Sequence, residues 1–339
     1  MKENIVKYLA CPECNGEIQI SKPYKIDTYD EIKEGTINCQ KCRLSWPIKG
    51  YIPRFVCEKN YSRSFGFQWN KHKTSQLDSI TGLQISHDRF FNETKWPLNM
   101  RGSLILEAGC GAGRFTEIVL KTGAEVFSFD YSTAVDACLE NNGLMNNLHI
   151  IQADIYNIPF KKELFDKIFC FGVLQHTPNV EKAFKSLTPF LKPGGSIIID
   201  VYSKSPWLLW RVKYKLRPFT KVIPNNLLYL MLKLLVPFGI KLKTKLSKCN
   251  SILARKIGEA IPILNYKGVY SLSYKQLLDW AILDTFDMFS PKYDQPQDIE
   301  DVREWFKKAN LSKSEVEFGG NGIVGRGVKV EARKTISKE

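Results

Sequence analysis

The chain has no aspartate or glutamate between positions 201 and 258, a segment that holds 13 lysines and arginines. Elsewhere 36 basic side chains are balanced by 35 acidic ones, so nearly all of the net charge of +14 belongs to this segment. A protein that is basic over its whole surface, as diffuse binding to a polyanion would require, is therefore excluded. The uneven charge instead predicts one basic docking surface on an otherwise neutral protein.

The sequence also lacks a signal peptide and a run long enough to span a membrane. The first residues, MKENIVKYLACPEC, reach a cysteine pair before an apolar signal core can form, which predicts a cytoplasmic protein. The most apolar run covers 14 residues, 227–240, and is interrupted by Lys233 and Pro237. A spanning helix needs about 18 to 20 apolar residues. In a cytoplasmic protein, the nine cysteines are expected to be metal ligands or buried thiols rather than disulfides.

Four of the cysteines form two C-x2-C pairs. Cys11 and Cys14 lie in CPEC, Cys39 and Cys42 lie in CQKC, and 24 residues separate the two pairs. Two such turns direct four thiolates at one ion, which predicts a tetrahedral site for Zn2+. Because protein ligands fill all four positions, the zinc is expected to be structural rather than catalytic. The stretch that ends in INCQKCRLSWPIKGYIPRF resembles the small zinc-ribbon proteins that partner RNA and protein methyltransferases.

The stretch SLILEAGCGAGRFTEIVLKTG has the pattern of a strand, a tight glycine turn and a helix. Its first apolar run ends in Glu107, and Gly109, Gly111 and Gly113 follow at alternate positions. Glycines in this arrangement let a ligand approach the main chain closely and permit unusual backbone angles. The next apolar run, EVFSFD, ends in Asp130, about 20 residues after the turn, where an acid can bind both hydroxyls of a ribose.

The spacing E-x-G-x-G-x-G resembles the first motif of class I S-adenosylmethionine (SAM) methyltransferases and differs from the G-x-G-x-x-G motif of dinucleotide-binding domains. Further landmarks of that family follow in order: IIQADIYNIPF, FDKIFCFGVLQHTPN and LKPGGSIIIDVY. The resemblance covers residues 103–202 and implies SAM as the cofactor. It further implies that Glu107, Gly109, Gly111 and Gly113 bind the methionine part, Asp130 the ribose, and Asp154 with Ile155 the adenine.

The resemblance implies an α/β fold with a Rossmann-like, seven-stranded sheet whose last strand is antiparallel. PQDIEDVREWFKKANL has the apolar spacing of a helix, and SEVEFGGNGIVGRGVKVEA alternates as a hairpin does. A basic, apolar and mainly helical insertion precedes that helix, beside the carboxyl ends of the strands, where ligands bind. The predicted parts are a zinc ribbon (1–57), aromatic-rich lid helices (58–102), a SAM-binding core (103–202 and 291–333) and an acceptor-side cap (203–290).

Aromatic side chains are frequent in the segment between the ribbon and the first core strand. Tyr61, Phe67 and Trp69 are candidates to line a lid over the cofactor, as a helix at this place does in families of this kind. The alternative is ordinary packing between the ribbon and the core.

Three residues are candidates for the chemistry. Methyl transfer is an in-line displacement that requires alignment and, for a hydroxyl acceptor, a base. His176 follows the fourth strand, and the ordinary pKa of a histidine suits a base near neutral pH; the alternative is a histidine that orients its turn. Asp287 and Tyr293 lie in LDTFDMFSPKYDQP, a loop dense in acids and aromatics, as acceptor contacts or as part of a solvated capping loop.

The residues after the fourth strand bear on the acceptor. They lack the Asn/Asp-Pro-Pro-aromatic motif common in enzymes that methylate exocyclic amines of nucleic acids, and GVLQHTPN resembles the quinone-biosynthesis and polysaccharide-associated enzymes. We therefore expect O-methylation of a small or lipid-linked metabolite. An RNA methyltransferase that uses the ribbon and the basic segment is the alternative enzyme, and a non-catalytic SAM-fold binding module is the alternative outside catalysis.

The basic segment gives two conflicting patterns. Ser205 and Pro206 suit the start of a short helix that Pro218 would end, whereas residues 210–217 alternate between apolar and basic as a strand does. The apolar run 227–240 and the lysines after it suit an element in the interface of an anionic membrane, on its inner face. Packing on the core or a second subunit, and binding of RNA, are the alternatives; the oligomeric state stays open.

Overall fold

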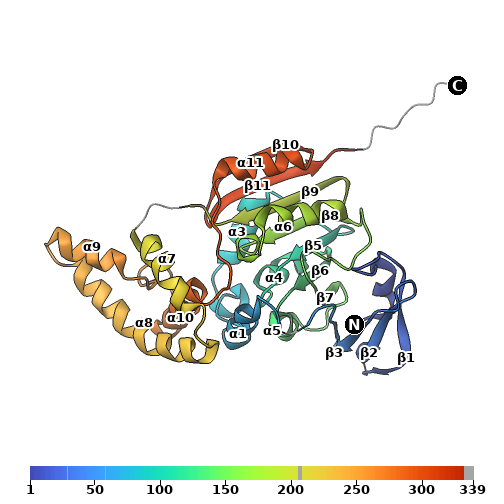
Figure 1. Cartoon of the computed structure of the whole chain (residues 1–339), viewed down its shortest axis with the longest axis horizontal. Coiled ribbons are helices and arrows are strands. Elements are labelled where there is room, and N and C mark those ends of the chain that lie inside the picture. Colours follow the sequence, from blue (N-terminus) through green and yellow to red (C-terminus); the bar gives the residue numbers. More distant parts are fainter. Residues whose placement is uncertain (29, 58, 205–207, 332–339) are drawn as a thin grey trace.

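The computed structural model describes residues 1–339 except 29, 58, 205–207 and 332–339. The N-terminal ribbon lies at one end, a layer of strands and helices lies in the centre, and a group of helices lies at the other end (Figure 1). The cofactor-binding and acceptor-binding parts expected from the sequence are thus spatially adjacent, with the ribbon on the far side of the core.

The ribbon is an antiparallel sheet that follows a short 3-10 helix, Glu3–Tyr8. Its strands, in spatial order, are β1 (Ile18–Ile26), β2 (Ile32–Cys39), β3 (Ser45–Lys49) and β4 (Ile52–Pro53). After β4, Arg54 forms a parallel bridge to Gln152 at the end of core strand β7, and its guanidinium binds Asp136 at 2.6 Å. The ribbon is therefore joined to the edge of the core sheet by backbone pairing as well as by an ion pair.

The core is a seven-stranded sheet with the order β10-β11-β9-β8-β5-β6-β7. Strand β11 runs antiparallel to both β9 and β10, and the remaining neighbours are parallel. The strands are β5 (Leu104–Ala108), β6 (Glu125–Asp130), β7 (Leu148–Gln152), β8 (Phe165–Phe171), β9 (Leu191–Val201), β10 (Leu311–Gly319) and β11 (Gly322–Lys329). The predicted α/β class with an antiparallel last strand is confirmed.

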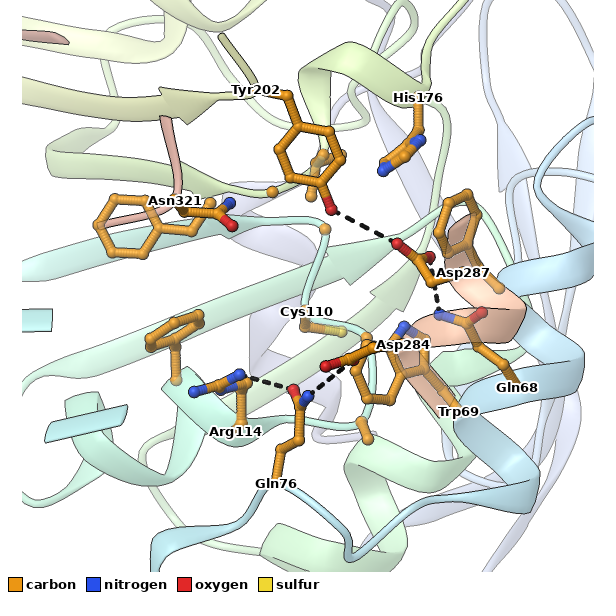
Figure 2. Close-up of a pocket in the computed structure, with 18 of the residues that line it drawn as sticks. Gln68, Trp69, Gln76, Cys110, Arg114, His176, Tyr202, Asp284, Asp287 and Asn321 are labelled. Carbon is orange, nitrogen blue, oxygen red and sulfur yellow. Dashed lines mark hydrogen bonds between the residues drawn. The ribbon is translucent and has the colours of Figure 1, made fainter. Parts of the chain in front are cut away.

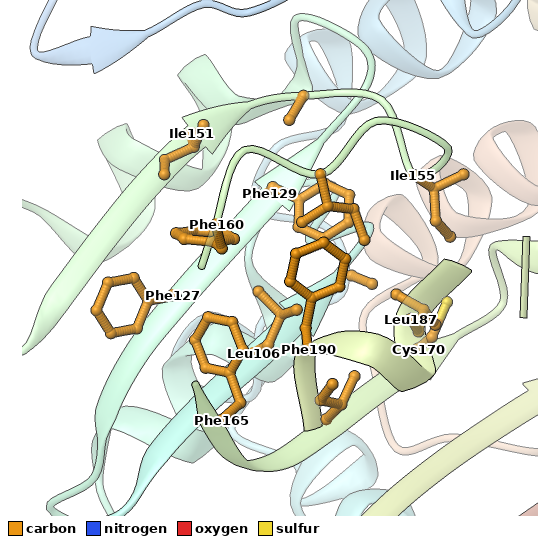
Figure 3. Close-up of a cluster of buried hydrophobic side chains, with 14 of the residues drawn as sticks. Leu106, Phe127, Phe129, Ile151, Ile155, Phe160, Phe165, Cys170, Leu187 and Phe190 are labelled. Atoms are coloured by element: carbon orange, nitrogen blue, oxygen red, sulfur yellow. The ribbon is translucent and has the colours of Figure 1, made fainter. Parts of the chain in front are cut away.

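Both faces of the sheet are covered because its central strands are apolar on both sides. Leu106 and Phe127 belong to one buried cluster, which Figure 3 shows, whereas Ile105 belongs to the other. Helices α6 (Val180–Leu187) and α11 (Ile299–Lys308) cover the first face, and α3 (Ile85–Thr94), α4 (Arg114–Leu120) and α5 (Ala134–Asn142) cover the second. Helices α1 (Arg63–Lys71) and α2 (Asp78–Thr81) lead from the ribbon to α3.

The cap follows β9. It consists of α7 (Leu208–Thr220), α8 (Asn225–Ser247), α9 (Ile252–Ala260) and α10 (Tyr274–Phe289). Leu228, Leu232 and Val236 lie on one stripe of α8 and are buried in a cluster with α10 residues such as Phe286. The cap has its own small apolar core, which accounts for part of the apolar run that the sequence shows.

The structure decides between the two patterns of the basic segment. Residues 208–220 form a helix, as the first pattern predicts, and not a strand, but Pro218 lies inside the last turn of this helix instead of ending it. Helical spacing brings Lys213 and Arg217 to one buried side, where both face Asp294, at 2.5 Å and 3.6 Å. This buried ion pair outweighs the alternating pattern. Ser205 and Pro206 lie outside the described residues, and within the described part of the chain no helix meets the length and apolarity that a bilayer-crossing helix requires.

Candidate active site

One large cavity lies between the carboxyl ends of the core strands and the cap. Its volume is about 1430 Å³, whereas sites for one small molecule usually measure about 300 to 1000 Å³. The glycine turn after β5 forms part of one wall, and α10 forms part of the opposite wall (Figure 2). The cavity can therefore hold a cofactor and an acceptor together.

The glycine turn has the backbone that the sequence predicts. Gly109, Gly111 and Gly113 have φ angles of 83°, 52° and 86°, in the left-handed region. A Cβ on Gly109 would lie 2.2 Å from a methyl group of Val173, so no larger residue fits there. Gly109 and Gly111 line the cavity, while Gly113 starts α4 and packs against Cys138.

Asp130 lines the cavity at the end of β6. Its Oδ2 accepts a hydrogen bond from the Gly111 backbone N–H at 3.0 Å, and its Oδ1 accepts from the Ser132 N–H and hydroxyl at 2.8 and 2.7 Å. Burial raises the pKa of the carboxyl. The side chain is fixed beside the glycine turn, which is the place that a ribose-binding acid requires.

Of the two predicted adenine contacts, one lines the cavity and the other does not. Ile155 lines the cavity, whereas the Asp154 carboxylate accepts a hydrogen bond from the Tyr156 backbone N–H at 3.0 Å and is not part of the cavity wall. Tyr61 and Tyr131 do line the cavity near them, with ring centroids 4.8 Å apart. The cavity wall around Ile155 is thus apolar and aromatic, and Asp154 borders it.

Glu107 lies behind the cavity rather than in its wall. Only 2% of its surface is exposed, and its Oε2 accepts hydrogen bonds from the hydroxyls of Thr116 and Ser128 at 2.5 and 2.7 Å. Burial raises the pKa of its carboxyl to about 7. Glu107 therefore links β5 to α4 and β6 behind the glycine turn, and it does not line the cavity.

Two acids project from α10 into the cavity. Asp284 and Asp287 are three residues apart and so lie on one face of the helix. Asp287 accepts hydrogen bonds from Gln68 at 3.1 Å and from the Tyr202 hydroxyl at 3.4 Å (Figure 2). Gln68 comes from α1 and Tyr202 directly follows β9, so Asp287 joins three segments that are distant in the sequence.

Asp284, the other acid, also accepts hydrogen bonds from two side chains. It accepts a hydrogen bond from Gln76 at 3.2 Å and another from the Tyr266 hydroxyl. Burial raises the pKa of its carboxyl to about 7. The sequence indicated an acidic cluster here but did not distinguish Asp284 from its neighbours, because its burial depends on the fold of the cap.

His176 lines the cavity, and Tyr293 does not. His176 is buried in a short 3-10 helix after β8, and its Nδ1 lies 3.0 Å from the backbone oxygen of Tyr293. The imidazole packs against Phe65 and Tyr202, with centroid distances of 4.8 and 5.5 Å. If Nδ1 donates its proton to that carbonyl, Nε2 is left as an acceptor. Tyr293 therefore orients His176 through its main chain, while its ring packs against Tyr61.

Two of the three candidate lid residues line the cavity, and the third packs against the cap. Trp69 and Tyr61 line the cavity, and the Trp69 indole lies 3.1 Å from the position of a Cβ on Gly111. Phe67 lies on the other side of α1 and packs against Tyr229 and Phe286 of the cap. Helix α1 thus contacts the glycine-turn side of the cavity with one face and the cap with the other.

Several other residues line the cavity that no sequence motif predicts. Arg114 donates hydrogen bonds to Gln76 at 2.6 Å and to Ser86 at 3.1 Å, and burial lowers the pKa of its guanidinium to about 10. Tyr270 and Trp280 line the cap side, with stacked rings 5.0 Å apart. Arg114 directly follows the glycine motif, so its position in the sequence could identify it as a candidate. No sequence pattern identifies Tyr270 and Trp280.

The four predicted zinc ligands lie together in the ribbon, away from the cavity. Their sulfur atoms all lie within 4.8 Å of one another, and Cys39 Sγ also receives the backbone N–H groups of Lys41 and Cys42. A Cβ on Gly16 would lie 3.2 Å from two of these sulfurs. Four converging thiols with backbone donors fit a closed structural zinc site.

Residues 106–199 match the family model described as a methyltransferase domain. Together with the strand order, this match identifies this part of the chain as a methyltransferase domain with the class I fold.

Two curated relatives cover this domain. One is the tRNA U34 carboxymethyltransferase of Nautilia profundicola, 31% identical over 39% of this chain and 51% of that protein. Another is the ubiquinone biosynthesis O-methyltransferase of Coxiella burnetii, 27% identical over 32% of this chain and 47% of that protein. The chain spans about half the length of these relatives, and the similarity is confined to part of each protein.

Among solved structures, a putative SAM-dependent methyltransferase of Methanococcus maripaludis is similar in fold. It is 14% identical, covers 83% of this chain and 99% of that chain, and has a TM-score of 0.44.

Proposed function

We propose that the protein transfers a methyl group from SAM to a hydroxyl oxygen of a small or lipid-linked metabolite, such as a sugar precursor or a quinone-like ring. One observation carries this proposal: the methyltransferase motifs and the α10 acids line a single cavity that is large enough for two ligands. We expect the reaction to take place in the cytoplasm, at the inner face of the membrane.

In this proposal the core wall holds the cofactor. Gly109 and Gly111 provide close approach to the main chain, Asp130 binds the ribose hydroxyls, and Ile155 packs on the adenine. Asp154 lies next to that region, and Glu107 with Gly113 fixes the shape of the turn. When bound, SAM supplies an electrophilic methyl group on a sulfonium and leaves as a neutral thioether.

The cap wall activates the acceptor. We assign Asp287 as the general base that receives the hydroxyl proton while the oxygen–methyl bond forms and the carbon–sulfur bond breaks. The hydrogen bonds from Gln68 and Tyr202 orient its carboxylate. His176 hydrogen-bonds the acceptor through Nε2, and Tyr293 holds the imidazole in that orientation.

The remaining wall suits an acceptor with a polar head and a ring. Asp284 and Arg114 offer an acceptor and a donor of hydrogen bonds, and the Tyr270–Trp280 pair offers a flat apolar surface. The name of the Coxiella relative, an O-methyltransferase, agrees with a hydroxyl acceptor. The name of the Nautilia relative concerns tRNA, so RNA is the acceptor class that the experiment must exclude.

The test offers three acceptor fractions to the protein with methyl-labelled SAM: a membrane lipid extract, soluble sugar nucleotides and total RNA. We expect label in the lipid or sugar fraction, and loss of that label in Asp287→Asn but not in Asp298→Asn, an exposed acid outside the cavity. Label in RNA would overturn the acceptor assignment. Absence of transfer to all three fractions by a protein that binds SAM would overturn the proposed activity on them.

A further inference from the structure

Helix α8 has an apolar face that nothing in the described part of the chain covers. Leu230, Leu234, Leu235 and Phe238 are 55%, 70%, 52% and 66% exposed. Leu230, Leu234 and Phe238 point away from the stripe that packs on α10, whereas Leu235 lies beside that stripe, so the helix is apolar nearly all round. A contiguous exposed apolar face of this kind marks a site of interaction with another protein or a membrane.

The exposed face continues onto the neighbouring elements of the cap. Phe219 and Val222 lie at the corner between α7 and α8, and Ile252 and Leu253 lie on α9; each is at least 65% exposed. More than half of the large apolar side chains that are exposed in the described residues lie between positions 216 and 257. We call this set, from Leu216 to Ile257, the outer cap face. It lies at the end of the molecule opposite the zinc ribbon (Figure 1).

Positive charge borders the outer cap face. Lys241, Lys245 and Lys248 are exposed at the C-terminal end of α8, and Arg255 and Lys256 are exposed on α9. Lys245 follows Leu234 and Phe238 at spacings of eleven and seven residues, which places all three on the same side of the helix. No acid occurs between positions 201 and 258, so the partner of this face has a negative charge of its own.

The charge and the side-chain types of the outer cap face indicate which kind of partner fits it. A two-fold contact with a second copy would bring two strongly basic faces together without any acid to pair them. Single-stranded RNA is bound through aromatic stacking and polar groups, whereas the centre of this face is leucine. Apolar side chains bordered by lysines are the pattern of a helix that lies in the interface of an anionic bilayer. We propose that the outer cap face docks on a membrane of anionic phospholipids.

The same helix joins the proposed membrane face to the cavity. Lys243, nine residues after Leu234 and so on the opposite side of α8, lines the cavity, as does Leu264 after α9. A lipid-linked acceptor can therefore keep its chain in the bilayer while its polar head enters beneath α8. This inference rests on the proposed lipid-linked acceptor and names the surface that would deliver it.

The experiment is vesicle flotation of the full chain. We expect binding to phosphatidylcholine vesicles that contain phosphatidylglycerol, weak binding to phosphatidylcholine alone, and loss of binding at high salt. Leu234→Ser with Phe238→Ser should weaken binding about tenfold or more. The matched control is Leu98→Ser with Phe318→Ser, where both side chains are 68% exposed but lie outside the cap, and it should bind like the wild type.

A second pair of variants tests the charge. Lys241→Gln with Lys245→Gln should weaken binding to phosphatidylglycerol vesicles, whereas Lys307→Gln with Lys313→Gln, two exposed lysines of the core, should not. Equal binding by all variants, or no vesicle binding by the wild type, would overturn the proposal. So would a dimer, seen by sedimentation, that Leu234→Ser with Phe238→Ser dissociates, or an RNA complex that these substitutions abolish.

Failure of this proposal is distinguishable from failure of the proposed function. SAM binding by calorimetry and methyl transfer to an acceptor dispersed in detergent do not require the outer cap face. A protein that retains both but floats with no vesicle contradicts the docking surface alone. A protein that floats but transfers no methyl group to lipid contradicts the acceptor assignment alone.

Discussion

Gly109 and Val173 are in contact across the cofactor wall, so that a Cβ on Gly109 would lie 2.2 Å from a methyl group of Val173. The contact joins the glycine turn after β5 to the segment after β8. It leaves no space for a side chain at position 109.

The first prediction follows from that contact. Gly109→Ala should lower the affinity for SAM about tenfold or more and destabilise the fold by about 1 to 3 kcal/mol, because the new methyl group displaces Val173. Gly102→Ala is the matched control, since Gly102 has φ 84° and no atom within 4 Å of its Cβ position. Gly102→Ala should lower the free energy of unfolding only by the backbone strain of an alanine at positive φ, about 1 to 2 kcal/mol. It should bind SAM normally. Calorimetric titration and thermal unfolding measure both effects.

The ribbon should hold one zinc ion per chain. Cys39→Ser removes a ligand from the four-cysteine cluster, so metal content should fall and the ribbon should unfold, because binding of a structural zinc is worth about 10 kcal/mol or more. Cys57→Ser, an exposed cysteine outside the cluster, should retain the metal. Elemental analysis and thermal unfolding with and without a chelator provide the measurement. Full zinc content in Cys39→Ser would contradict the site.

Asp287 should be required for turnover and not for cofactor binding. Asp287→Asn keeps the size of the side chain and loses the base, so kcat should fall about 10²- to 10⁴-fold while the Kd for SAM changes little. Tyr202→Phe, which removes the hydroxyl bound to Asp287, should have a smaller effect in the same direction. Steady-state kinetics with the acceptor fraction that takes up label in the transfer test decide this, and an unchanged kcat in Asp287→Asn would remove Asp287 from the mechanism.

Asp284 should make the fold less stable as the pH rises. Its pKa is raised by burial from 3.8 in the unfolded chain to about 7, so between these values the native state binds the proton that the unfolded state has released. The contribution of this group to unfolding free energy therefore falls from about pH 4 to pH 7, by about 4 kcal/mol at most. Asp284→Asn should show a smaller loss of stability over that interval than Asp298→Asn in denaturant titrations. Parallel curves for the two variants would contradict the assignment.

The sequence predicts best where a feature depends on neighbours in the chain. The glycine turn, the acid at the end of β6 and the paired cysteines are local patterns, and the structure has the turn and the cysteine cluster as expected. The helix over 208–220, in contrast, has contacts with residues that are distant in the sequence. Lys213 and Arg217 are held by Asp294, which lies far along the chain, and that buried partner overrides both the alternating pattern and the proline.

The acceptor wall could be predicted only in part for the same reason. The sequence predicts an acidic loop around Asp287, which is wrong because Asp287 lies in α10, and its partners Gln68 and Tyr202 come from two other segments. Tyr293 acts through its backbone oxygen, which a pattern of side chains does not reveal. Phe67 and Trp69 are two residues apart on α1, and only the packing of the cap determines which of them faces the cavity.

The most direct test of the account is calorimetric titration of SAM into the full-length protein and into Asp130→Ala. The account predicts one SAM site per chain in the wild type, and at least about a tenfold loss of affinity in the variant, because the carboxylate that would bind the ribose hydroxyls is removed. The control is Asp136→Ala, which removes an acid of α5 outside the cavity and should bind SAM as the wild type does. A folded wild type that binds no SAM, or an Asp130→Ala variant with unchanged affinity, would contradict it.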